Sequence, residues 1–384
     1  MSSSFSGPSL LAAYGWDEAL DEVFSSYRAA GLVPARVAAV DRGLCDVVAE
    51  DGPARASTAA LSTTALSTTA LSTTALSTAA VPGDPPAAPC TGDWAALRPD
   101  GPGGRPAVAA LLPRRTAIVR ASAARDSRGQ VLAANVDTVA VTVPLDARPA
   151  PGRIERLVAL AWESGARPVV VLTKADRAPG AAGAAAEAAA AAPGVQVVAC
   201  SAATGAGVDA VRAALTGTVA LVGPSGAGKS TLGNALLGAE VLATGAVRES
   251  DGRGRHTTVR RELLPLPGGG VLIDTPGLRG VGLFGASEGL ERTFADVEEL
   301  AAGCRFGDCA HLSEPGCAVL AAVEDGTLPR RRLDSYRRLL RENAWAASRT
   351  DARLRAEREN RWKSVSRAQR RMYRDRDRGR GRDR

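Results

Sequence analysis

The chain has 384 residues, of which 45% are hydrophobic and 23% charged, a composition typical of a folded protein with two or three domains. Its formal net charge is +7, but residues 361–384 alone hold eleven Lys and Arg against three Asp, so the preceding residues sum to −1. The basic tail predicts attraction to nucleic acid, with solubility as the alternative. No stretch predicts a membrane span and the start lacks the pattern of a signal peptide, so we expect no membrane contact and a cytoplasmic location.

The first 34 residues follow a helical pattern and predict an N-terminal extension. Residues 35–122 contain short apolar runs separated by Gly and Pro, which predict strands and are compatible with a small β-barrel. The runs are Val37–Val40, Cys45–Val48 and Ala117–Val119. An insert at 56–88 repeats Ala-Leu-Ser-Thr-Thr and then becomes rich in Pro. We expect a flexible loop between two barrel strands there and assign it no function.

Residues 123–300 predict an α/β domain. Apolar β-branched runs alternate with helical patterns, which indicates a parallel sheet covered on both faces. The runs are 136–143, 169–172, 195–199, 219–222 and 271–273, with helical patterns at 154–162, 181–192 and 208–215. Each motif below begins where one of these runs ends. Because ligands of open α/β sheets bind at the carboxyl ends of strands, we expect one shared site.

A phosphate-binding loop follows the run at 219–222 and precedes a helical pattern at 231–237. The residues that fit G-x-x-x-x-G-K-[ST] and the position after it are Gly223, Pro224, Ser225, Gly226, Ala227, Gly228, Lys229, Ser230 and Thr231. Backbone N–H groups of such a loop cradle phosphate oxygens, the Lys neutralises the β- and γ-phosphates, and the Ser hydroxyl ligates Mg²⁺. The alternative is a glycine-rich turn that matches by chance, which would need neither the strand nor the helix.

Two further segments predict metal and γ-phosphate contacts. In Asp274-Thr275-Pro276-Gly277 the carboxylate of Asp274 would hold Mg²⁺ and the N–H of Gly277 would approach the γ-phosphate. In the loop 254–258, Thr258 is the first choice and Thr257 the second for a hydroxyl that ligates Mg²⁺ only when the γ-phosphate is present. An ordinary polar loop is the alternative for 254–258.

Thr173-Lys174-Ala175-Asp176 resembles the guanine-reading N/T-K-x-D element of GTPases. Asp176 would accept hydrogen bonds from guanine N1 and N2, and the stem of Lys174 would pack along the base. Ser201-Ala202, after the run at 195–199, would offer a backbone N–H to guanine O6. The alternative is a Lys and an Asp that face solvent. In GTPases this element ordinarily follows the phosphate loop, so its upstream position indicates a circularly rearranged chain.

A metal site is predicted in the C-terminal region, a helical zinc-binding domain at 301–360. Four ligands in the spacing C-x₄-C-x-H-x₅-C suit one structural zinc: Cys304, Cys309, His311 and Cys317. Buried free cysteines beside a solvent-facing histidine are the alternative. Residues 361–384 predict a disordered basic tail. Together with the Arg clusters at 330–332 and 337–338, this tail would contact RNA phosphates.

Taken together, these motifs resemble the circularly permuted GTPases, specifically the ribosome small-subunit-dependent GTPase A family (RsgA/YjeQ). The resemblance covers roughly 35–345 and implies three domains: an N-terminal OB-like barrel, a central circularly permuted P-loop GTPase domain and a C-terminal zinc domain. It implies GTP hydrolysis to GDP during late maturation of the small ribosomal subunit, with the subunit and its rRNA as partners and a monomeric protein. Thr91-Gly92-Asp93-Trp94 fits the barrel, whereas the insert 56–88 and the Arg-rich tail depart from the family.

The same resemblance assigns a catalytic role to one histidine. Leu278 stands where many small GTPases have a water-orienting Gln, so we expect slow intrinsic hydrolysis. The family implies that His256 orients the water when the ribosome holds its loop, and the alternative is a histidine without a catalytic role. Thr173 replaces the more usual Asn.

Two other functions stay open from the residues. A P-loop ATPase or kinase would not need Asp176, and a non-catalytic RNA-binding protein would show no turnover. The permuted order also suggests a hypothesis about motion. Because the segments 254–258 and 274–292 run directly into the Cys/His region, a change at the γ-phosphate could reposition that region.

Overall fold

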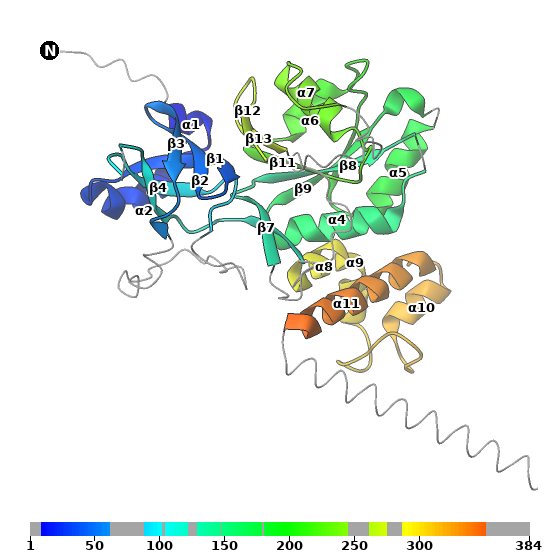
Figure 1. Cartoon of the computed structure of the whole chain (residues 1–384). Coiled ribbons are helices and arrows are strands. Elements are labelled where there is room, and N and C mark those ends of the chain that lie inside the picture. The colour runs from blue at the N-terminus through cyan, green and yellow to red at the C-terminus, as the bar shows by residue number, and fades with distance from the viewer. Residues whose placement is uncertain are drawn as a thin grey trace, which may run out of the picture.

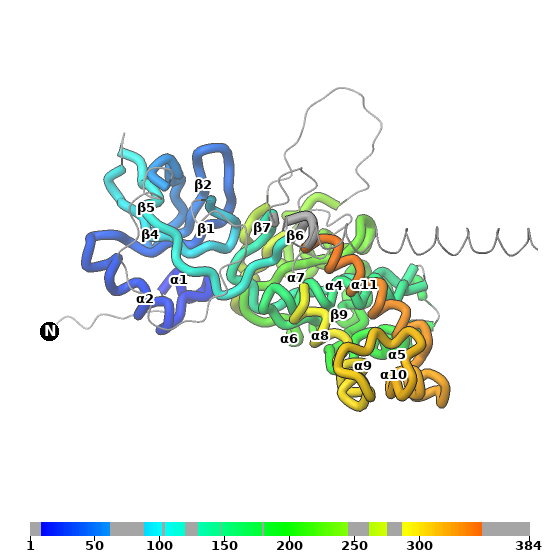
Figure 2. Tube along the Cα trace, turned by 90° about the horizontal axis from the view of Figure 1, so that it is seen from below, coloured from blue at the N-terminus to red at the C-terminus, as the bar shows by residue number. Residues whose placement is uncertain are grey.

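The structure is a computed structural model and describes residues 9–61, 88–101, 104–121, 129–146, 148–178, 180–244, 261–274 and 286–350. Most of the repeat insert, the loop 254–258, Gly277, Leu278 and the tail lie outside these ranges. Figures 1 and 2 show a barrel at one end, a sheet with helices in the middle and a group of helices at the other end. In the described ranges, no helix has the length and apolar character needed to cross a membrane.

Five short strands close into a barrel in the order β1-β2-β3-β5-β4. They are β1 (Val33–Asp41), β2 (Leu44–Ala49), β3 (Gly52–Ser57), β4 (Trp94–Arg98) and β5 (Ala107–Leu111). Val37, Val47 and Val108 are almost fully buried inside it. Closure leaves no exposed sheet edge, and the predicted OB-like barrel is confirmed. β3 ends at Ser57, inside the predicted insert 56–88, and the Ala-Leu-Ser-Thr-Thr repeats follow it in the chain before β4.

Two N-terminal helices, α1 (Leu10–Ala13) and α2 (Glu18–Ala29), pack on the outside of the barrel. Asp17 caps α2 by accepting a hydrogen bond from the N–H of Leu20 at 2.9 Å. The apolar face of α2 meets the outward side of β4, where the rings of Trp16 and Trp94 are in edge contact with centroids 4.9 Å apart. Both helices lie within residues 1–34, for which the sequence predicts a helical extension.

A separate hairpin follows the barrel, formed by β6 (Ala117–Ala121) and β7 (Gly129–Ala134). The sequence placed Ala117–Val119 in the barrel region and a domain boundary at 122/123. The strand is confirmed, but the structure corrects its partner: β6 pairs with β7 outside the barrel. The physical reason is burial, because Ile118 and Leu132 of the hairpin belong to the core of the central sheet.

The central domain is a six-stranded sheet in the order β10-β9-β8-β11-β13-β12. Its strands are β8 (Thr138–Pro144), β9 (Arg167–Thr173), β10 (Gln196–Ala199), β11 (Thr218–Val222), β12 (Leu263–Pro265) and β13 (Val271–Asp274). All neighbours pair in parallel except β12, an antiparallel edge strand that the sequence did not predict. Three residues are too few for a recognisable apolar period.

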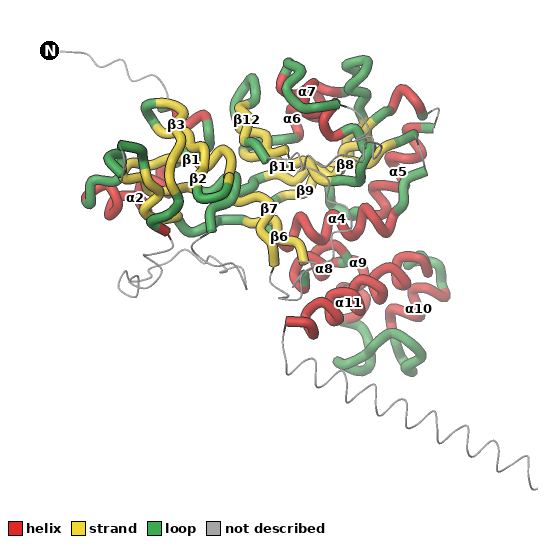
Figure 3. Tube along the Cα trace, viewed as in Figure 1, coloured by secondary structure: helices red, strands yellow, loops and turns green. Residues whose placement is uncertain are grey.

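Helices cover both faces of this sheet, as predicted (Figure 3). They are α4 (Pro151–Glu163), α5 (Ala181–Ala191), α6 (Val208–Ala214) and α7 (Lys229–Leu237). Alternate side chains of β11 pack into the two cores on opposite faces of the sheet. Ala220 and Val222 face α4 and α5, and Val219 and Leu221 face α6 and α7. Each large apolar side chain buried in this way contributes about 1.5–3 kcal/mol.

The C-terminal module is defined here as residues 286–350. It contains α8 (Ser287–Thr293), α9 (Ala295–Ala301), α10 (Ala318–Glu324) and α11 (Arg330–Thr350). The predicted boundary at 300/301 falls within α9. Leu290 of α8 and Val297 of α9 share one core with Val319 and Leu339 of α10 and α11, and Ala159 of α4 contributes to the same core, so we describe the four helices together.

Arg36 joins the barrel to the central domain. Its side chain leaves β1 on the outer side and is 1% exposed. It donates hydrogen bonds to the carbonyl of Tyr14 at 2.7 Å, the carbonyl of Asn135 at 3.1 Å and Oγ1 of Thr218 at 3.1 Å. Burial lowers the pKa of Arg36 to about 10. Because a buried guanidinium without acceptors is costly, these bonds fix the barrel against the start of β11.

Candidate nucleotide site and metal centre

The carboxyl ends of the parallel strands bring the predicted motifs to one edge of the sheet. The phosphate loop follows β11 in the middle of the sheet, Thr173 ends β9, and Asp274 ends β13. Ser201 comes two residues after β10. Positions that are about a hundred residues apart in the chain therefore converge, because the strand order and not the chain order decides which ends are neighbours.

Three glycines allow the chain to form the phosphate loop. A Cβ on Gly223 would lie 2.2 Å from Oγ1 of Thr142 on β8, so only glycine fits this close approach. Gly226 and Gly228 have φ of +77° and +79°, which is the left-handed region that favours glycine. The loop leads directly into α7, whose first residue is Lys229. Ser230 and Thr231 lie in its first turn, where helix N–H groups attract anions.

Lys229 folds back over the loop. Its Nζ donates to the carbonyl of Gly223 at 3.0 Å and to the carbonyl of Pro224 at 2.8 Å. Burial lowers the pKa of Lys229, and the charge of Asp274 opposes that effect. Burial likewise raises the pKa of Asp274, while Lys229 opposes it. The two charges thus stabilise each other at the place where a phosphate and its metal ion would lie.

The predicted guanine-reading segment 173–176, called the base reader below, is hydrogen-bonded to the phosphate loop. Oγ1 of Thr173 donates to the carbonyl of Ala227 at 2.7 Å, and Thr173 is 2% exposed. A Cβ placed on Gly228 would lie 3.7 Å from this oxygen and 3.9 Å from Cε of Lys174. The Thr that replaces the usual Asn therefore still ties the two segments together.

Lys174 is held by a residue that the sequence analysis missed. Its Nζ forms an ion pair with Asp146 at 2.5 Å, and its backbone has a φ of +59°, rare for a residue other than glycine. Asp146 follows β8, and its pKa is lowered by the hydrogen bond from Lys174. The available signal was positional: Asp146 stands just beyond an apolar run, as do the motifs that were recognised.

The segment after β10 is bonded to the base reader as well. The N–H of Ala175 donates to the carbonyl of Cys200 at 3.1 Å, which places Ser201 and Ala202 beside it. The N–H of Ser201 already donates a hydrogen bond to the carbonyl of Ala206 at 2.8 Å. Of the two residues, Ala202 is therefore the better candidate to donate its N–H to guanine O6. Asp176 is exposed at the sheet edge, where its carboxylate is accessible to a ligand. His256, Thr258 and Gly277 lie outside the described residues.

The four predicted metal ligands form one cluster. Their ligand atoms all lie within 4.8 Å of one another, with Nδ1 of His311 at 3.6 Å from Sγ of Cys304 and 3.4 Å from Sγ of Cys317. Cys309 completes the set. Burial lowers the pKa of His311, which favours the neutral imidazole that binds metals.

The loop that carries these ligands is held in shape by a carboxylate. Glu314 accepts hydrogen bonds from the N–H groups of Ala310, Leu312 and Ser313 at 2.7–3.0 Å. Backbone N–H groups, its own among them, lower the pKa of Glu314 to about 2. His311 has a φ of +55°, a conformation that a free loop would avoid. The donor set and this geometry fit a bound metal ion.

Comparisons with known proteins agree with this site. The family profile described as RsgA GTPase matches residues 111–284, which include the base reader, the phosphate loop and Asp274. A protein of Streptomyces coelicolor named small ribosomal subunit biogenesis GTPase RsgA is 52% identical over 92% of each chain. The chain belongs to the RsgA family. A relative of the same name from Opitutus terrae is 43% identical over 94% of this chain and 97% of its own.

Two solved structures share the fold. YjeQ from Thermotoga maritima superimposes with a TM-score of 0.55 at 22% identity, over 81% of this chain and 98% of its own. YloQ, described as a circularly permuted GTPase, gives a TM-score of 0.54 at 19% identity over 81% and 94%. The circularly permuted GTPase fold that the motif order predicted is therefore confirmed.

The bond between Thr173 and Ala227 leads to a testable prediction. Thr173→Val keeps the shape of the side chain but leaves the carbonyl of Ala227 without its donor. We expect the Kd for GDP, measured by fluorescence titration, to rise about tenfold, the equivalent of one buried hydrogen bond. Thr173→Ser retains the hydroxyl and should stay within about twofold of the wild type. Equal affinities of the Val and Ser variants would contradict the role.

Proposed function

We propose that this chain binds GTP with Mg²⁺ and hydrolyses it to GDP on the small ribosomal subunit, during late maturation of that subunit. The observation that carries the proposal is the bonded pair of base reader and phosphate loop at one sheet edge, in a chain of the RsgA family. The ribosomal partner is supported by the names of the relatives. We further propose that the protein acts as a cytoplasmic monomer and contacts rRNA.

Binding divides among three groups of residues. Backbone N–H groups of 223–230 and Lys229 hold the phosphates. Ser230 and Asp274, joined by Thr258, hold Mg²⁺, which when bound neutralises charge that develops on the phosphates. Asp176 accepts from guanine N1 and N2, and Ala202 donates to O6. Adenine lacks the N2 donor and the O6 acceptor, so Asp176 and Ala202 select guanine.

Hydrolysis needs a water molecule held in line with the γ-phosphate. Leu278 has no polar group for this task, so turnover by the isolated chain is slow. In this proposal His256 orients the water once the subunit holds its loop. In this proposal the chain supplies His256, and the subunit supplies the contacts that hold it in position.

The cluster Cys304, Cys309, His311 and Cys317 holds one structural zinc ion in this proposal. Three thiolates and an imidazole form a closed four-ligand set, which leaves no position for a substrate and therefore favours a structural over a catalytic role. Zinc is preferred because a compact site with sulfur and nitrogen ligands suits it.

The first experiment measures hydrolysis of GTP and ATP with and without purified small subunits. We expect slow GTP turnover that the subunits raise at least about tenfold, with little ATP turnover, because Asp176 pairs only with guanine. His256→Ala should bind GTP normally and lose the stimulation. Comparable ATP turnover would favour an ATPase, and no turnover with subunits would favour a non-catalytic RNA-binding protein. Unchanged stimulation of His256→Ala would contradict its role.

The metal proposal has its own test. Elemental analysis of the purified chain should find about one zinc per molecule, because the four ligands form a single site. Cys309→Ser should lose most of it and unfold the module at lower temperature, since the metal links the loop 304–317. Cys200→Ser, which removes a buried thiol outside the cluster, is the control and should keep its zinc. Full zinc content in Cys309→Ser would contradict the ligand set.

A further inference from the structure

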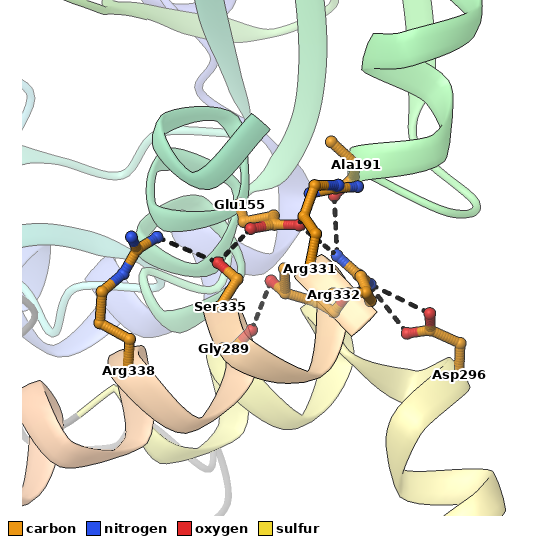
Figure 4. Close-up of polar contacts among 9 residues, drawn as sticks. Glu155, Ala191, Gly289, Asp296, Arg331, Arg332, Ser335 and Arg338 are labelled. Atoms are coloured by element: carbon orange, nitrogen blue, oxygen red, sulfur yellow. Dashed lines mark hydrogen bonds and ion pairs between the residues drawn. The ribbon is translucent and has the colours of Figure 1, made fainter. Parts of the chain in front are cut away.

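A buried carboxylate lies between the central domain and the C-terminal module. Glu155 on α4 has a fully buried side chain, and all its recorded partners come from α11. Oε1 accepts from Arg331 at 3.0 Å and from Arg332 at 3.1 Å, and Oε2 accepts from the hydroxyl of Ser335. Figure 4 shows these side chains converging on Glu155. A buried carboxylate is tolerated only with such partners, so the module is needed to satisfy this group of the central domain.

Arg332 on the module is the opposite member of the pair. Its side chain is 2% exposed, so the predicted contact of the cluster 330–332 with RNA phosphates does not hold for Arg332. Nη1 donates to Glu155 and to the carbonyl of Ala191 at 3.0 Å. Nη2 donates to the carbonyl of Thr293 at 2.6 Å and to Asp296 at 2.8 Å, and Nε donates to Asp296 at 3.0 Å. A guanidinium has five N–H donors, and all five are therefore used.

Two of the four residues that accept hydrogen bonds from Arg332 belong to elements of the central domain that lead to the nucleotide site. Glu155 is on α4, which follows β8 and Asp146. Ala191 ends α5, the helix that follows the base reader. Thr293 and Asp296 belong to α8 and α9 of the module itself, so they hold the guanidinium in place from its own side. A Lys at 332 would offer three donors from a single point and could not serve these four positions together.

We propose that Arg332 and Glu155, together called the latch, are positioning residues, which fix the orientation of the C-terminal module relative to the nucleotide site. A partner that contacts both parts at once requires this fixed orientation. The module and the central domain move as one body, because separating them would leave Glu155 buried or newly hydrated without its guanidinium. This proposal differs from the hypothesis that the γ-phosphate repositions the module, because here α4 and α5 hold the module from the side of the base reader.

Contacts around the pair support a defined orientation. Arg156 on α4 forms an ion pair with Glu342 on α11. The N–H of Gly289 donates to Glu163 at 2.8 Å, and the guanidinium of Arg292 lies 3.9 Å from the ring centroid of Trp162. These contacts are more exposed than the central pair, so each contributes less, but they spread along α4 and resist rotation.

The turnover part of the test rests on the proposed function. Arg332→Lys and Glu155→Gln are compared with Arg212→Gln, a control on α6 whose ion pair with Asp209 is exposed and which lies outside the predicted RNA-contacting Arg clusters. We expect both latch variants to keep the GTP affinity and the subunit-free turnover within about twofold, and to lose at least about tenfold in subunit-stimulated kcat, as misplacement of a contact surface does. Hydrogen exchange should rise in α4 and at the end of α5 in both of these variants, and Arg212→Gln should behave as the wild type.

The outcomes are separable. If Arg332→Lys fails to fold, Glu155→Gln decides, because it keeps the pair between Arg332 and Asp296. A wild type without stimulation overturns the proposed function, and the exchange data then decide whether the latch holds the module. If the subunits stimulate the wild type and stimulate Glu155→Gln to the same extent, the positioning role alone is overturned. Unchanged exchange in α4 and α5 overturns the latch itself.

Discussion

The site depends on one geometric constraint: the carboxyl ends of parallel strands meet at the same edge of a sheet. Here β9, β8, β11 and β13 lie in consecutive places, so the base reader and the phosphate loop are separated by a single strand. That distance is short enough for the hydroxyl of Thr173 to reach the carbonyl of Ala227. The order in which the chain visits the strands does not enter this geometry. A circular rearrangement therefore keeps the site while it changes where the chain enters and leaves.

At each end of the central domain, a buried arginine joins it to the neighbouring domain. Toward the barrel, Arg36 is buried against two backbone carbonyls and a hydroxyl. Toward the module, Arg332 is buried against Glu155 and the carbonyl of Ala191 in the central domain, and against Asp296 and the carbonyl of Thr293 within the module. A planar guanidinium can bind acceptors from several elements at once, which makes Arg suited to joining domains. Burying either guanidinium has a desolvation penalty, and its hydrogen bonds offset that penalty only when the domains are correctly placed.

Much of the architecture was predictable because it follows from local pattern. Apolar runs such as 169–172 and 219–222 predict buried parallel strands, and the spacing from Cys304 to Cys317 predicts a metal cluster. Motif order predicted the permutation. The phosphate loop was recognisable because its glycines are required by close approach, as the contact of Gly223 with Thr142 shows.

What the sequence did not reveal depends on contacts between distant segments. Asp146 is one acidic residue among many until β8 and β9 pair and bring it to Lys174. The partner of β6 depends on which core buries Ile118, and the boundary of the module depends on the packing of α8 and α9. Glu155 sits on an amphipathic helix where a charge predicts a solvated face, and only the docking of α11 makes it buried.

The central claim is that base reader and phosphate loop form one guanine-nucleotide site. Competition of unlabelled GDP and ADP against a fluorescent guanine nucleotide tests it most directly, with no need for ribosomal subunits. The account predicts that GDP displaces the probe at a concentration at least about a hundredfold lower than ADP. With ADP, Asp176 and the N–H of Ala202 would both be covered by a base that does not pair with them, and each such unpaired group costs about 1–3 kcal/mol. Displacement by GDP and ADP at equal concentrations would contradict it.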